Sequence, residues 1–452
     1  MIRSSHFSGK TYAVLGLARS GLAAAECLLA SGARVVAWDR QDIARAALEG
    51  RVELVDPLEI NLSGFDGVVV SPGVPINTHP ISQHALNAGV PLIGDIELFA
   101  LARPDLPPHK VVGITGTNGK STTTALVHHL FEEAGVPSLM GGNIGLPILA
   151  QEPLPAGGIY VLELSSFQID LTFSLQCDAA ALTNITPDHL DRYAGFSAYA
   201  ASKARLFAMQ SEAQFAVFGC ADASTRAVQQ NELTRRVQGR AVCMLPGQWA
   251  PHQAEWPSLQ GPHNLQNAAI AAALALELGL TREQILAGLA SFRGLAHRME
   301  MLGTFGGVLF INDSKATNPA SAAPALAAFP PAPGKRIHWI LGGLPKGDNL
   351  GECEAFFGNV AAAYTIGEAG PRFADILEPV THVVRCELLS EAVSRAIEAA
   401  KPGDVVLFSP ACASFDQFRD YEMRGDAFRE IVAMLTGEAA AEPVACPGRS
   451  AA

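Results

Sequence analysis

A glycine-rich segment that ends in Gly-Lys-Ser is the part of this chain best suited to chemistry. The apolar run Val111–Thr115 leads into Gly116-Thr117-Asn118-Gly119-Lys120-Ser121-Thr122. In such loops glycines let backbone N–H groups face phosphate oxygens, the lysine reaches the terminal phosphates, and the serine hydroxyl binds Mg²⁺ at a helix N-terminus. Ile114 stands where the usual pattern G-x-x-x-x-G-K-[ST] has its first glycine. The segment predicts an ATP phosphate site of a variant kind, with an ordinary strand, turn and helix as the alternative.

Three further polar residues are candidates for the same site. Glu163 closes the apolar strand Gly158–Glu163, where a carboxylate can hold Mg²⁺ or simply cap the next helix. His189 lies in a polar loop that leaves a buried strand, so it can contact metal or substrate, although a solitary histidine is more often a surface residue. Lys203 falls in the helical run Phe196–Phe207 and, judged alone, is expected to be solvated.

Alternating apolar strands and helices divide the chain into three α/β blocks that would position these residues. The first contains strands Thr11–Gly16 and Arg34–Asp39, and the Pro-rich stretch Arg103–His109 separates it from the second. The third begins after Arg298 and has a further parallel-sheet pattern. We expect domains at 1–97, 98–298 and 299–437, and a disordered tail at 438–452.

Composition excludes several classes of protein. The 452 residues carry a formal net charge of −12, which does not favour a nucleic-acid binder. The eight cysteines form no C-x-x-C pair, which argues against a disulfide framework or structural zinc and suits a reducing compartment. Because no apolar run reaches spanning length, we expect a cytoplasmic protein without membrane insertion.

The first block leaves a different function open. Its turn Gly16–Gly21 has alanine where the dinucleotide fingerprint has its middle glycine, and Asp39 ends the second strand. Taken alone, this pattern gives weak support to an NAD-dependent oxidoreductase. An oxidoreductase function would not explain the presence of Lys120 and Ser121 in a phosphate-loop motif.

Taken together, the motifs resemble the Mur ligases of peptidoglycan synthesis over about Gly9 to Leu435. The resemblance is carried by the segments Thr115–Ser121, Gly141–Gly145, Glu163–Gln168, Pro187–Arg192, His297–Arg298 and Asn312–Asn318. Within the family, the segments most like members that join D-glutamate to UDP-N-acetylmuramoyl-L-alanine are Gly16–Gly21, Gly94–Phe99 and Ser409–Phe418. The resemblance implies a Rossmann-like UDP-binding domain, a central P-loop ATPase-like domain and a C-terminal Rossmann-like domain for the amino acid.

The resemblance also implies a reaction. The L-alanyl carboxylate attacks the γ-phosphate of ATP, and the D-glutamate amine then displaces phosphate from the acyl phosphate. Lys120 would contact the transferring phosphate, Ser121 and Glu163 would hold the first Mg²⁺, and His189 would approach a second. Lys203 matches the lysine that this family carries as a carbamate formed with CO₂, which would support the second Mg²⁺.

The resemblance also implies which residues bind each substrate, by their position in the matching motifs. The implied ATP set is Gly116, Thr117, Asn118, Gly119, Lys120, Ser121, Thr122, Asn267, Arg298, Asp313 and Lys315. The implied UDP-substrate set is Leu17, Ala18, Asp39, Arg40, Ser71 and Gly73, with Asn143, Ser165 and His189 nearer the muramyl-alanine end. The implied D-glutamate set is Thr317, Lys346, Ser414, Phe415 and Tyr421. Leu344 departs from relatives that place an aspartate in this turn.

Three alternatives remain beside this reading. Another amino-acid ligase of the superfamily, such as the folylpolyglutamate synthetase type, shares the phosphate loop but should lack the third-block signature. An oxidoreductase and a non-catalytic nucleotide-binding regulator belong to different classes. We expect a monomer that binds ATP, Mg²⁺, the UDP-sugar and D-glutamate.

Overall fold

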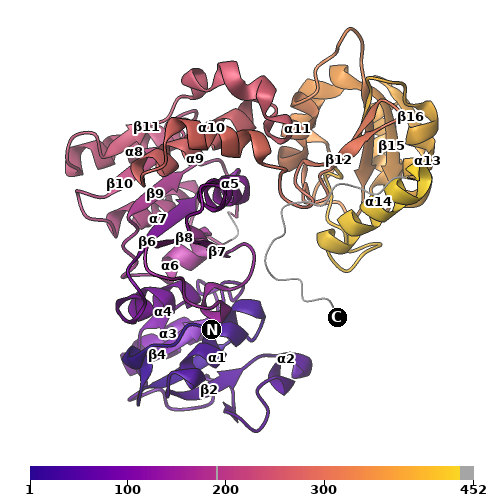
Figure 1. Cartoon of the computed structure of the whole chain (residues 1–452). Helices are drawn as coiled ribbons and strands as arrows, with labels where there is room; N and C mark the ends of the chain where they lie inside the picture. The colour runs from indigo at the N-terminus through magenta and orange to yellow at the C-terminus, as the bar shows by residue number, and fades with distance from the viewer. Residues whose placement is uncertain (190–191, 438–452) are drawn as a thin grey trace. The chain divides into compact units, whose positions relative to one another are not determined.

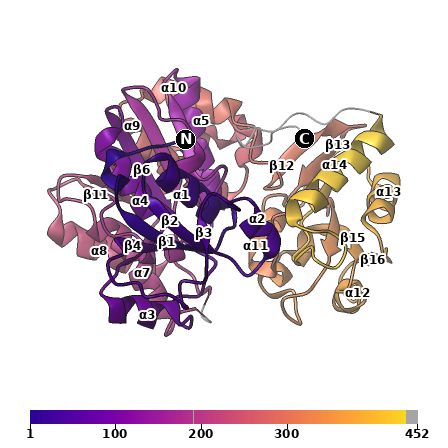
Figure 2. The same cartoon turned by 90° about the horizontal axis from the view of Figure 1, so that it is seen from below.

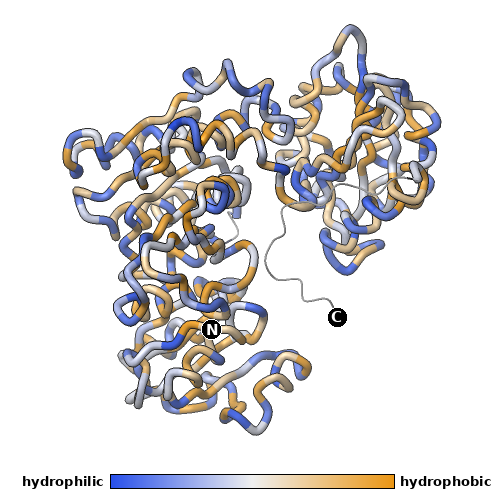
Figure 3. The backbone as a smooth tube through the Cα atoms, viewed as in Figure 1, coloured by the Kyte–Doolittle hydropathy of each residue, from blue (hydrophilic) through white to orange (hydrophobic). Residues whose placement is uncertain are grey.

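The computed structural model describes residues 1–189 and 192–437, which form two compact units. Unit 1 contains residues 1–246 and 266–288, and unit 2 contains residues 247–265 together with the described residues from 289 onward. Hydrophobic and hydrophilic stretches alternate along the chain in both units (Figure 3). The fold is mixed α/β and is built on three mainly parallel sheets, as expected (Figure 1).

The N-terminal sheet of unit 1 has the strand order β3-β2-β1-β4-β5, and all its pairs are parallel. Its strands are β1 (Thr11–Leu15), β2 (Arg34–Trp38), β3 (Glu53–Leu54), β4 (Gly67–Val70) and β5 (Leu92–Ile93). Its helices are α1 (Arg19–Ala30), α2 (Asp42–Ala46), α3 (Ile81–Ala88) and α4 (Asp95–Ala102). Helices α1 and α4 contribute to the core on one face and α3 to the core on the other, so the strands read as continuous apolar runs.

The second sheet of unit 1 has the order β11-β10-β9-β6-β8-β7 and is also parallel. Its strands are β6 (His109–Thr115), β7 (Ser138–Gly142), β8 (Gly158–Glu163), β9 (Ala179–Leu182), β10 (Phe215–Phe218) and β11 (Ala241–Cys243). The helices of this region are α5 (Lys120–Glu133), α6 (Ser166–Asp170), α7 (Phe196–Ala208), α8 (Ala223–Arg235), α9 (Pro262–Glu277) and α10 (Arg282–Ser291). Helix α5 lies against β7 and β8, and α7 lies against β6 and β9.

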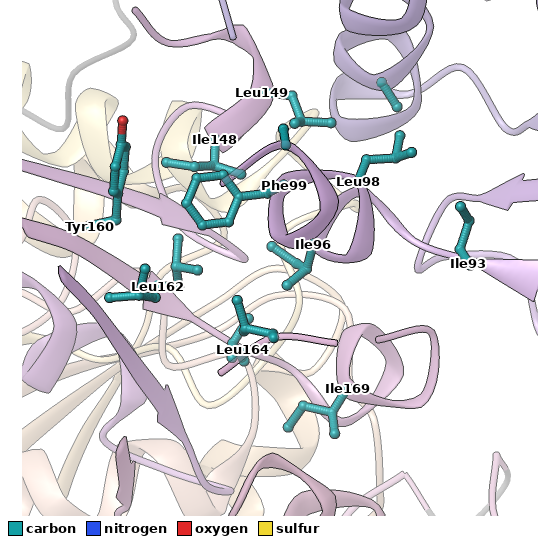
Figure 4. Close-up of a cluster of buried hydrophobic side chains, with 14 of the residues drawn as sticks. Ile93, Ile96, Leu98, Phe99, Ile148, Leu149, Tyr160, Leu162, Leu164 and Ile169 are labelled. Carbon is teal, nitrogen blue, oxygen red and sulfur yellow. The ribbon is translucent and has the colours of Figure 1, made fainter. Parts of the chain in front are cut away.

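One hydrophobic core joins the two sheets of unit 1. Figure 4 shows Ile96 and Phe99 of α4 among Tyr160 and Leu162 of β8, all of them buried. A buried carboxylate strengthens the junction, because Glu97 accepts hydrogen bonds from the backbone N–H groups of residues 173 and 174 at 2.7 and 3.0 Å. The N-terminal strands and the strand that carries Glu163 therefore share one packed core.

The sheet of unit 2 has the order β12-β13-β17-β14-β15-β16. Its strands are β12 (Glu300–Phe305), β13 (Val308–Asn312), β14 (Ile337–Gly342), β15 (Val360–Ile366), β16 (His382–Arg385) and β17 (Val405–Phe408). Its helices are α11 (Pro319–Ala327), α12 (Gly370–Leu377), α13 (Leu389–Ala399) and α14 (Tyr421–Thr436). Helices α11 and α12 share one core, and α13 and α14 share the other; Figure 2 shows α14 along β13.

The strands predicted for the third sheet are parallel, but the sheet also has an antiparallel edge strand that the sequence did not predict. Strand β12 pairs antiparallel with β13, because Gly306 and Gly307, with φ of 58° and 80°, turn the chain back directly. The other pairs of this sheet are parallel. Within the described part of the chain, no helix is both long enough and apolar enough to cross a membrane.

Candidate active site

The phosphate loop connects β6 to α5, and its glycines are required by close contacts. Gly116 has φ of 149°, and a Cβ there would lie 1.9 Å from Thr183 Oγ1. Gly119 has φ of 82°, and a Cβ there would lie 2.4 Å from Asn267 Oδ1. Helix α5 begins at Lys120, so Lys120, Ser121 and Thr122 form its first turn, as the motif predicts. Glycine at both positions lets the loop pass close to its neighbours.

Ile114, at the position of the usual first glycine, belongs to strand β6 and not to the phosphate loop. It is fully buried in β6, pairs with Glu163 on one side and Ala181 on the other, and accepts a hydrogen bond from Leu164 N–H at 2.8 Å. The strand continues through Thr115, so the glycine-rich turn starts at Gly116. The departure from the usual motif follows from a longer β6 and a buried side chain.

Residues at the end of β9 hold the loop in place, and the sequence analysis did not single them out. Asn184 Oδ1 accepts from Asn118 N–H at 2.9 Å, and Thr183 Oγ1 donates to Asn118 O at 2.6 Å. Thr117 Oγ1 lies 3.1 Å from Tyr199 OH and accepts from Thr186 N–H at 3.0 Å. The sequence feature that could have identified these residues is the polar run that directly follows β9, a buried strand that pairs with β6.

Two lysines converge on the phosphate loop. Lys120 Nζ donates to the carbonyl oxygens of Gly116 and Thr117 at 3.0 and 2.8 Å, and Lys203 Nζ donates to Gly116 O at 2.7 Å. Lys203 is 1% exposed, so the expectation of a solvated side chain is wrong. Position alone could not show this, because the side of α7 that faces β6 and β9 is set by packing.

Burial perturbs Lys203 strongly. Desolvation lowers the pKa of its ammonium well below the ordinary value, and the charge of Lys120 lowers that pKa further. The carboxylates of Asp188, Asp170 and Glu163 act in the opposite direction, and the ammonium also lies 4.5 Å from the centre of the Tyr199 ring. Desolvation is the largest of these effects, so Lys203 loses its proton more readily than an exposed lysine does.

Oxygen ligands suited to Mg²⁺ meet beside the loop. Ser121 Oγ donates to Glu163 Oε2 at 2.5 Å, and Asn143 Nδ2 donates to Glu163 Oε1 at 2.9 Å. Both Ser121 and Glu163 are buried. A Mg²⁺ ion is commonly held by one or two such oxygens together with substrate phosphates and water, so this pair fits that ion. No cluster of three or more His, Cys, Asp or Glu side chains that could hold a metal was found among the described residues.

His189 lies close to this region but is half exposed. Its backbone is left-handed, with φ of 51°, and its ring centre lies 5.0 Å from that of Phe167. Its Nε2 lies 3.6 Å from Asp188 Oδ2. Ser165 lies nearby in sequence as the N-cap of α6, where it forms a capping box with Gln168.

The predicted UDP residues gather at the carboxyl ends of β1, β2 and β4. Asp39 Oδ2 accepts from Leu17 N–H at 2.7 Å, and Asp39 Oδ1 accepts from Gln41 N–H at 2.9 Å. Ser71 Oγ donates to Gly16 O at 2.8 Å. Ala18, Arg40 and Gly73 lie in the same three loops. This edge of a parallel sheet is where open α/β folds bind ligands.

In unit 2, the predicted D-glutamate residues lie in loops that follow three neighbouring strands, β13, β17 and β14, except for Tyr421, which begins α14. Lys346 Nζ donates to Thr317 Oγ1 at 3.4 Å, and Lys315 Nζ lies 3.9 Å from the centre of the Tyr421 ring. Ser414 is buried, whereas Phe415 is 69% exposed. The predicted D-glutamate set is thus brought to one edge of one sheet.

Leu344 contributes to this edge of the sheet through backbone hydrogen bonds. Its N–H and C=O groups pair with those of Ala413, both at 3.0 Å. The departure from aspartate at this position therefore leaves the pairing of the two loops intact.

Asp313 and Arg298 also belong to unit 2. Burial raises the pKa of Asp313 to about 7, although Ser409 Oγ donates to its carboxylate at 2.7 Å and Met299 N–H at 3.1 Å. Arg298 lies between His297 and Met299, which have φ of 62° and 47°. Left-handed residues on both sides of one arginine mark a strained turn of the kind found at functional sites.

Two segments of the chain match family models of known proteins. Residues 114–241 match the Mur ligase middle domain, and residues 297–412 match the domain described as Mur ligase, glutamate ligase domain. A protein of Novosphingobium aromaticivorans named UDP-N-acetylmuramoylalanine–D-glutamate ligase is 65% identical over 436 residues, which are 96% of this chain and 97% of that protein. A protein of the same name from Zymomonas mobilis is 53% identical over 96% of this chain and 100% of its own length.

Solved structures show the same fold at low identity. The UDP-N-acetylmuramate-alanine ligase of Thermotoga maritima aligns with a TM-score of 0.56 at 19% identity, covering 94% of this chain and 99% of that one. A UDP-N-acetylmuramoylalanyl-D-glutamyl-2,6-diaminopimelate–D-alanyl-D-alanyl ligase of Acinetobacter baumannii aligns with a TM-score of 0.56 at 17% identity, covering 95% and 92%. Sequence matches along nearly the full length, together with this shared fold, lead to one conclusion: the chain belongs to the Mur ligase family.

Proposed function

We propose that this chain joins D-glutamate to UDP-N-acetylmuramoyl-L-alanine with cleavage of ATP to ADP and phosphate through an acyl phosphate, in peptidoglycan precursor synthesis. The identity of 65% to a relative of that name carries the choice of substrates. The paired lysines on Gly116 O, beside the Ser121 and Glu163 oxygens, support the chemistry. The chain would act as a cytoplasmic monomer.

The domain assignment is part of this proposal. Residues 1–97 would bind the UDP-sugar, 98–298 would bind ATP, and 299–437 would bind the amino acid. The three sheets, one in each range, support this division. The expected disordered tail at 438–452 lies outside the described residues, as do two residues of the polar loop that carries His189.

The phosphate loop would bind and polarise ATP. Backbone N–H groups of the loop and Lys120 would hold the phosphates, and Asn267, beside Gly119, would fix the loop from α9. Bound Mg²⁺ would neutralise charge on the transferring phosphoryl group, with Ser121 and Glu163 as its protein ligands. Arg298, Asp313 and Lys315 are the remaining residues of the proposed ATP set.

Lys203 would carry a carbamate. Its neutral nitrogen would attack the carbon of CO₂ and release one proton, which converts a buried amine into an anion. The burial of Lys203, which favours the neutral amine, supports this step. The carbamate and His189 would then serve a second Mg²⁺.

A labelling experiment tests the carbamate. Protein incubated with ¹³C-bicarbonate should show one carbamate carbon resonance that is absent from Lys203→Met, and this variant should lose activity. Retention of the resonance in Lys203→Met, or full turnover by that variant, would contradict the assignment. Lys110→Met, which removes an exposed lysine on β6, is the matched control.

The substrate sets follow from the two sheet edges. Leu17, Ala18, Asp39, Arg40, Ser71 and Gly73 would contact the UDP moiety, and Asn143, Ser165 and His189 the muramyl-alanine end. Thr317, Lys346, Ser414, Phe415 and Tyr421 would bind D-glutamate. The contacts of Lys346 with Thr317 and of Lys315 with Tyr421 support a cationic site suited to a dicarboxylate.

Phosphate release tests the whole proposal. With ATP, Mg²⁺ and UDP-N-acetylmuramoyl-L-alanine present, D-glutamate should stimulate release, whereas L-glutamate, L-alanine and meso-diaminopimelate should not. Omission of the UDP-sugar should abolish the stimulation. Equal release with all the amino acids, or with none, would refute the proposed function.

A further inference from the structure

Arg424, in the first turn of α14, is a buried cation that the sequence motifs did not single out. Its side chain is 1% exposed. Nε donates to Ser314 Oγ at 3.1 Å, and Nη2 donates to Ser314 O at 2.8 Å. Both contacts fix the loop after β13, the loop that carries Lys315 and Thr317.

The same guanidinium holds the loop after β17. Nη1 donates to Ala413 O at 3.0 Å, and Nη2 donates to Cys412 O at 3.1 Å. Ser414 follows directly in this loop. Because the planar guanidinium fixes the directions of its donors, these contacts set both loops against one rigid group.

The loop after β14 reaches Arg424 as well. A Cβ on Gly343 would lie 3.1 Å from Arg424 Nη1 and 2.4 Å from Ala413 O, so only glycine lets this loop approach. Lys346 lies three residues farther along the same loop. Three strand-end loops that carry the proposed D-glutamate residues therefore meet around Arg424.

The partners of Arg424 are carbonyl and hydroxyl oxygens. In the described part of the chain no carboxylate lies within ion-pair distance of it. Burial lowers the pKa of Arg424 to about 10, so the group stays charged at neutral pH. Four hydrogen bonds satisfy its donors, and the charges of Asp416 and Asp313 act on it from beyond ion-pair distance, so Arg424 is a fixed structural cation at this sheet edge.

Gly425, the next residue, contacts a different part of the site. A Cβ there would lie 2.1 Å from His297 Nδ1, and Gly425 O accepts from Asn312 Nδ2 at 3.1 Å. Glycine within a helix reduces stability, and here it makes room for the imidazole. His297 is the left-handed residue that precedes Arg298, and its carbonyl accepts from Lys315 N–H at 2.9 Å.

We propose that Arg424 and Gly425 are positioning residues for two different substrates. Arg424 sets the three loops proposed to bind D-glutamate, and Gly425 makes room for His297, whose backbone adjoins Arg298 and holds Lys315, two residues of the proposed ATP set. This inference rests on the proposed function. Although the two residues are neighbours in α14, they contact different loops, so their substitution should change the KM values of different substrates.

Steady-state kinetics of Arg424→Lys and Gly425→Ala test the inference. Arg424→Lys keeps the charge but loses the fork, so the KM for D-glutamate should rise about tenfold or more while the KM for ATP changes less than about twofold. Gly425→Ala should show the reverse pattern. Arg419→Lys, which changes an exposed arginine just before α14, and Gly358→Ala, which changes a helical glycine with nothing within 4 Å of the Cβ position, are the matched controls.

A double variant separates positioning from general damage. In a His297→Ala background the added methyl of Gly425→Ala has no ring to displace, so it should change the KM for ATP by less than about twofold. Ser314→Ala, which removes one acceptor of Arg424, should raise the KM for D-glutamate even if Arg424→Lys does not fold.

Equal increases in the KM values for D-glutamate and ATP in both variants, or unchanged values, would overturn the inference. The proposed function would still stand if the wild type ligates D-glutamate. If the wild type instead used another amino acid, the proposed function would fail, and the same split measured with that amino acid would decide the inference.

Discussion

Lys120 and Lys203 donate hydrogen bonds to one and the same acceptor, the carbonyl oxygen of Gly116, at 3.0 and 2.7 Å. They come from the first turn of α5 and the middle of α7, which are far apart in sequence. Two ammonium groups on one carbonyl repel each other, and burial penalises the charge of Lys203. This arrangement supports the proposed roles, in which Lys120 would bind phosphate as a cation and Lys203 would become an anion as a carbamate.

Removal of the Lys120 ammonium should abolish most of the activity. In Lys120→Met the kcat for phosphate release should fall by about 10² or more, because the cation stabilises charge that develops on the transferring group. Circular dichroism should show an unchanged fold. Lys110→Met on the preceding strand should retain wild-type turnover, and a Lys120→Met variant within a factor of about three of wild type would remove Lys120 from the mechanism.

Gly119→Ala should weaken ATP binding through a direct clash. The new Cβ would lie 2.4 Å from Asn267 Oδ1, so the loop or α9 must shift, and the KM for ATP should rise at least about tenfold. Gly135→Ala is a matched control, since Gly135 has a similar φ of 74° with nothing within 4 Å of the Cβ position. Equal effects of the two substitutions would mean that backbone strain, and not the contact with Asn267, explains the loss.

Restoring the usual first glycine should be harmful. Ile114→Gly removes a fully buried side chain from β6 and should lower the free energy of unfolding by about 4 kcal/mol, since it combines cavity formation with a flexible strand residue. Urea unfolding measures this loss. The affinity for ATP should not improve. A stable variant with tighter ATP binding would show that Ile114 belongs functionally to the loop.

Asp95 should make stability depend on pH. Burial raises its pKa to about 6 in the folded protein, whereas an unfolded aspartate titrates near about 3.9. The folded state therefore holds its proton more tightly, and the stabilisation present below about pH 4 is lost as the pH rises through 6, a change of about 3 kcal/mol.

Thermal unfolding of Asp95→Asn between pH 4 and 8 checks this sign. Relative to wild type, the variant should gain stability as the pH rises, while Asp42→Asn, whose side chain is 92% exposed, should track the wild type. Parallel pH profiles of wild type and Asp95→Asn would exclude Asp95 as the titrating group.

Periodicity and turn residues predicted most of the fold. Strand Gly158–Glu163 is found with the predicted bounds, and α5 begins at Lys120 as the motif requires. Buried parallel strands are continuous apolar runs, which the sequence displays plainly. The antiparallel β12 was missed because Glu300–Phe305 includes a glycine and exposed positions, and its pairing depends on the turn at Gly306.

The candidate site was predicted less completely, for a physical reason. The loop chemistry of Lys120 and Ser121 is local in sequence, so a motif reveals it. The burial of Lys203 and the hydrogen bond from Asn118 N–H to Asn184 Oδ1 depend on how separate elements pack. Arg424 has the same character, because one of its partners, Ser314, lies 110 residues away in sequence. Such contacts leave no local pattern.

Transfer of oxygen from substrate to phosphate tests the central claim most directly. UDP-N-acetylmuramoyl-L-alanine labelled with ¹⁸O in its carboxylate should be incubated with ATP, Mg²⁺, D-glutamate and the protein, and the released phosphate analysed by mass. An acyl phosphate forms when a carboxylate oxygen attacks the γ-phosphorus, and the amine later breaks the carbon–oxygen bond, so the phosphate should carry one ¹⁸O. Unlabelled phosphate, or label in AMP, would contradict carboxylate activation by the loop that carries Lys120.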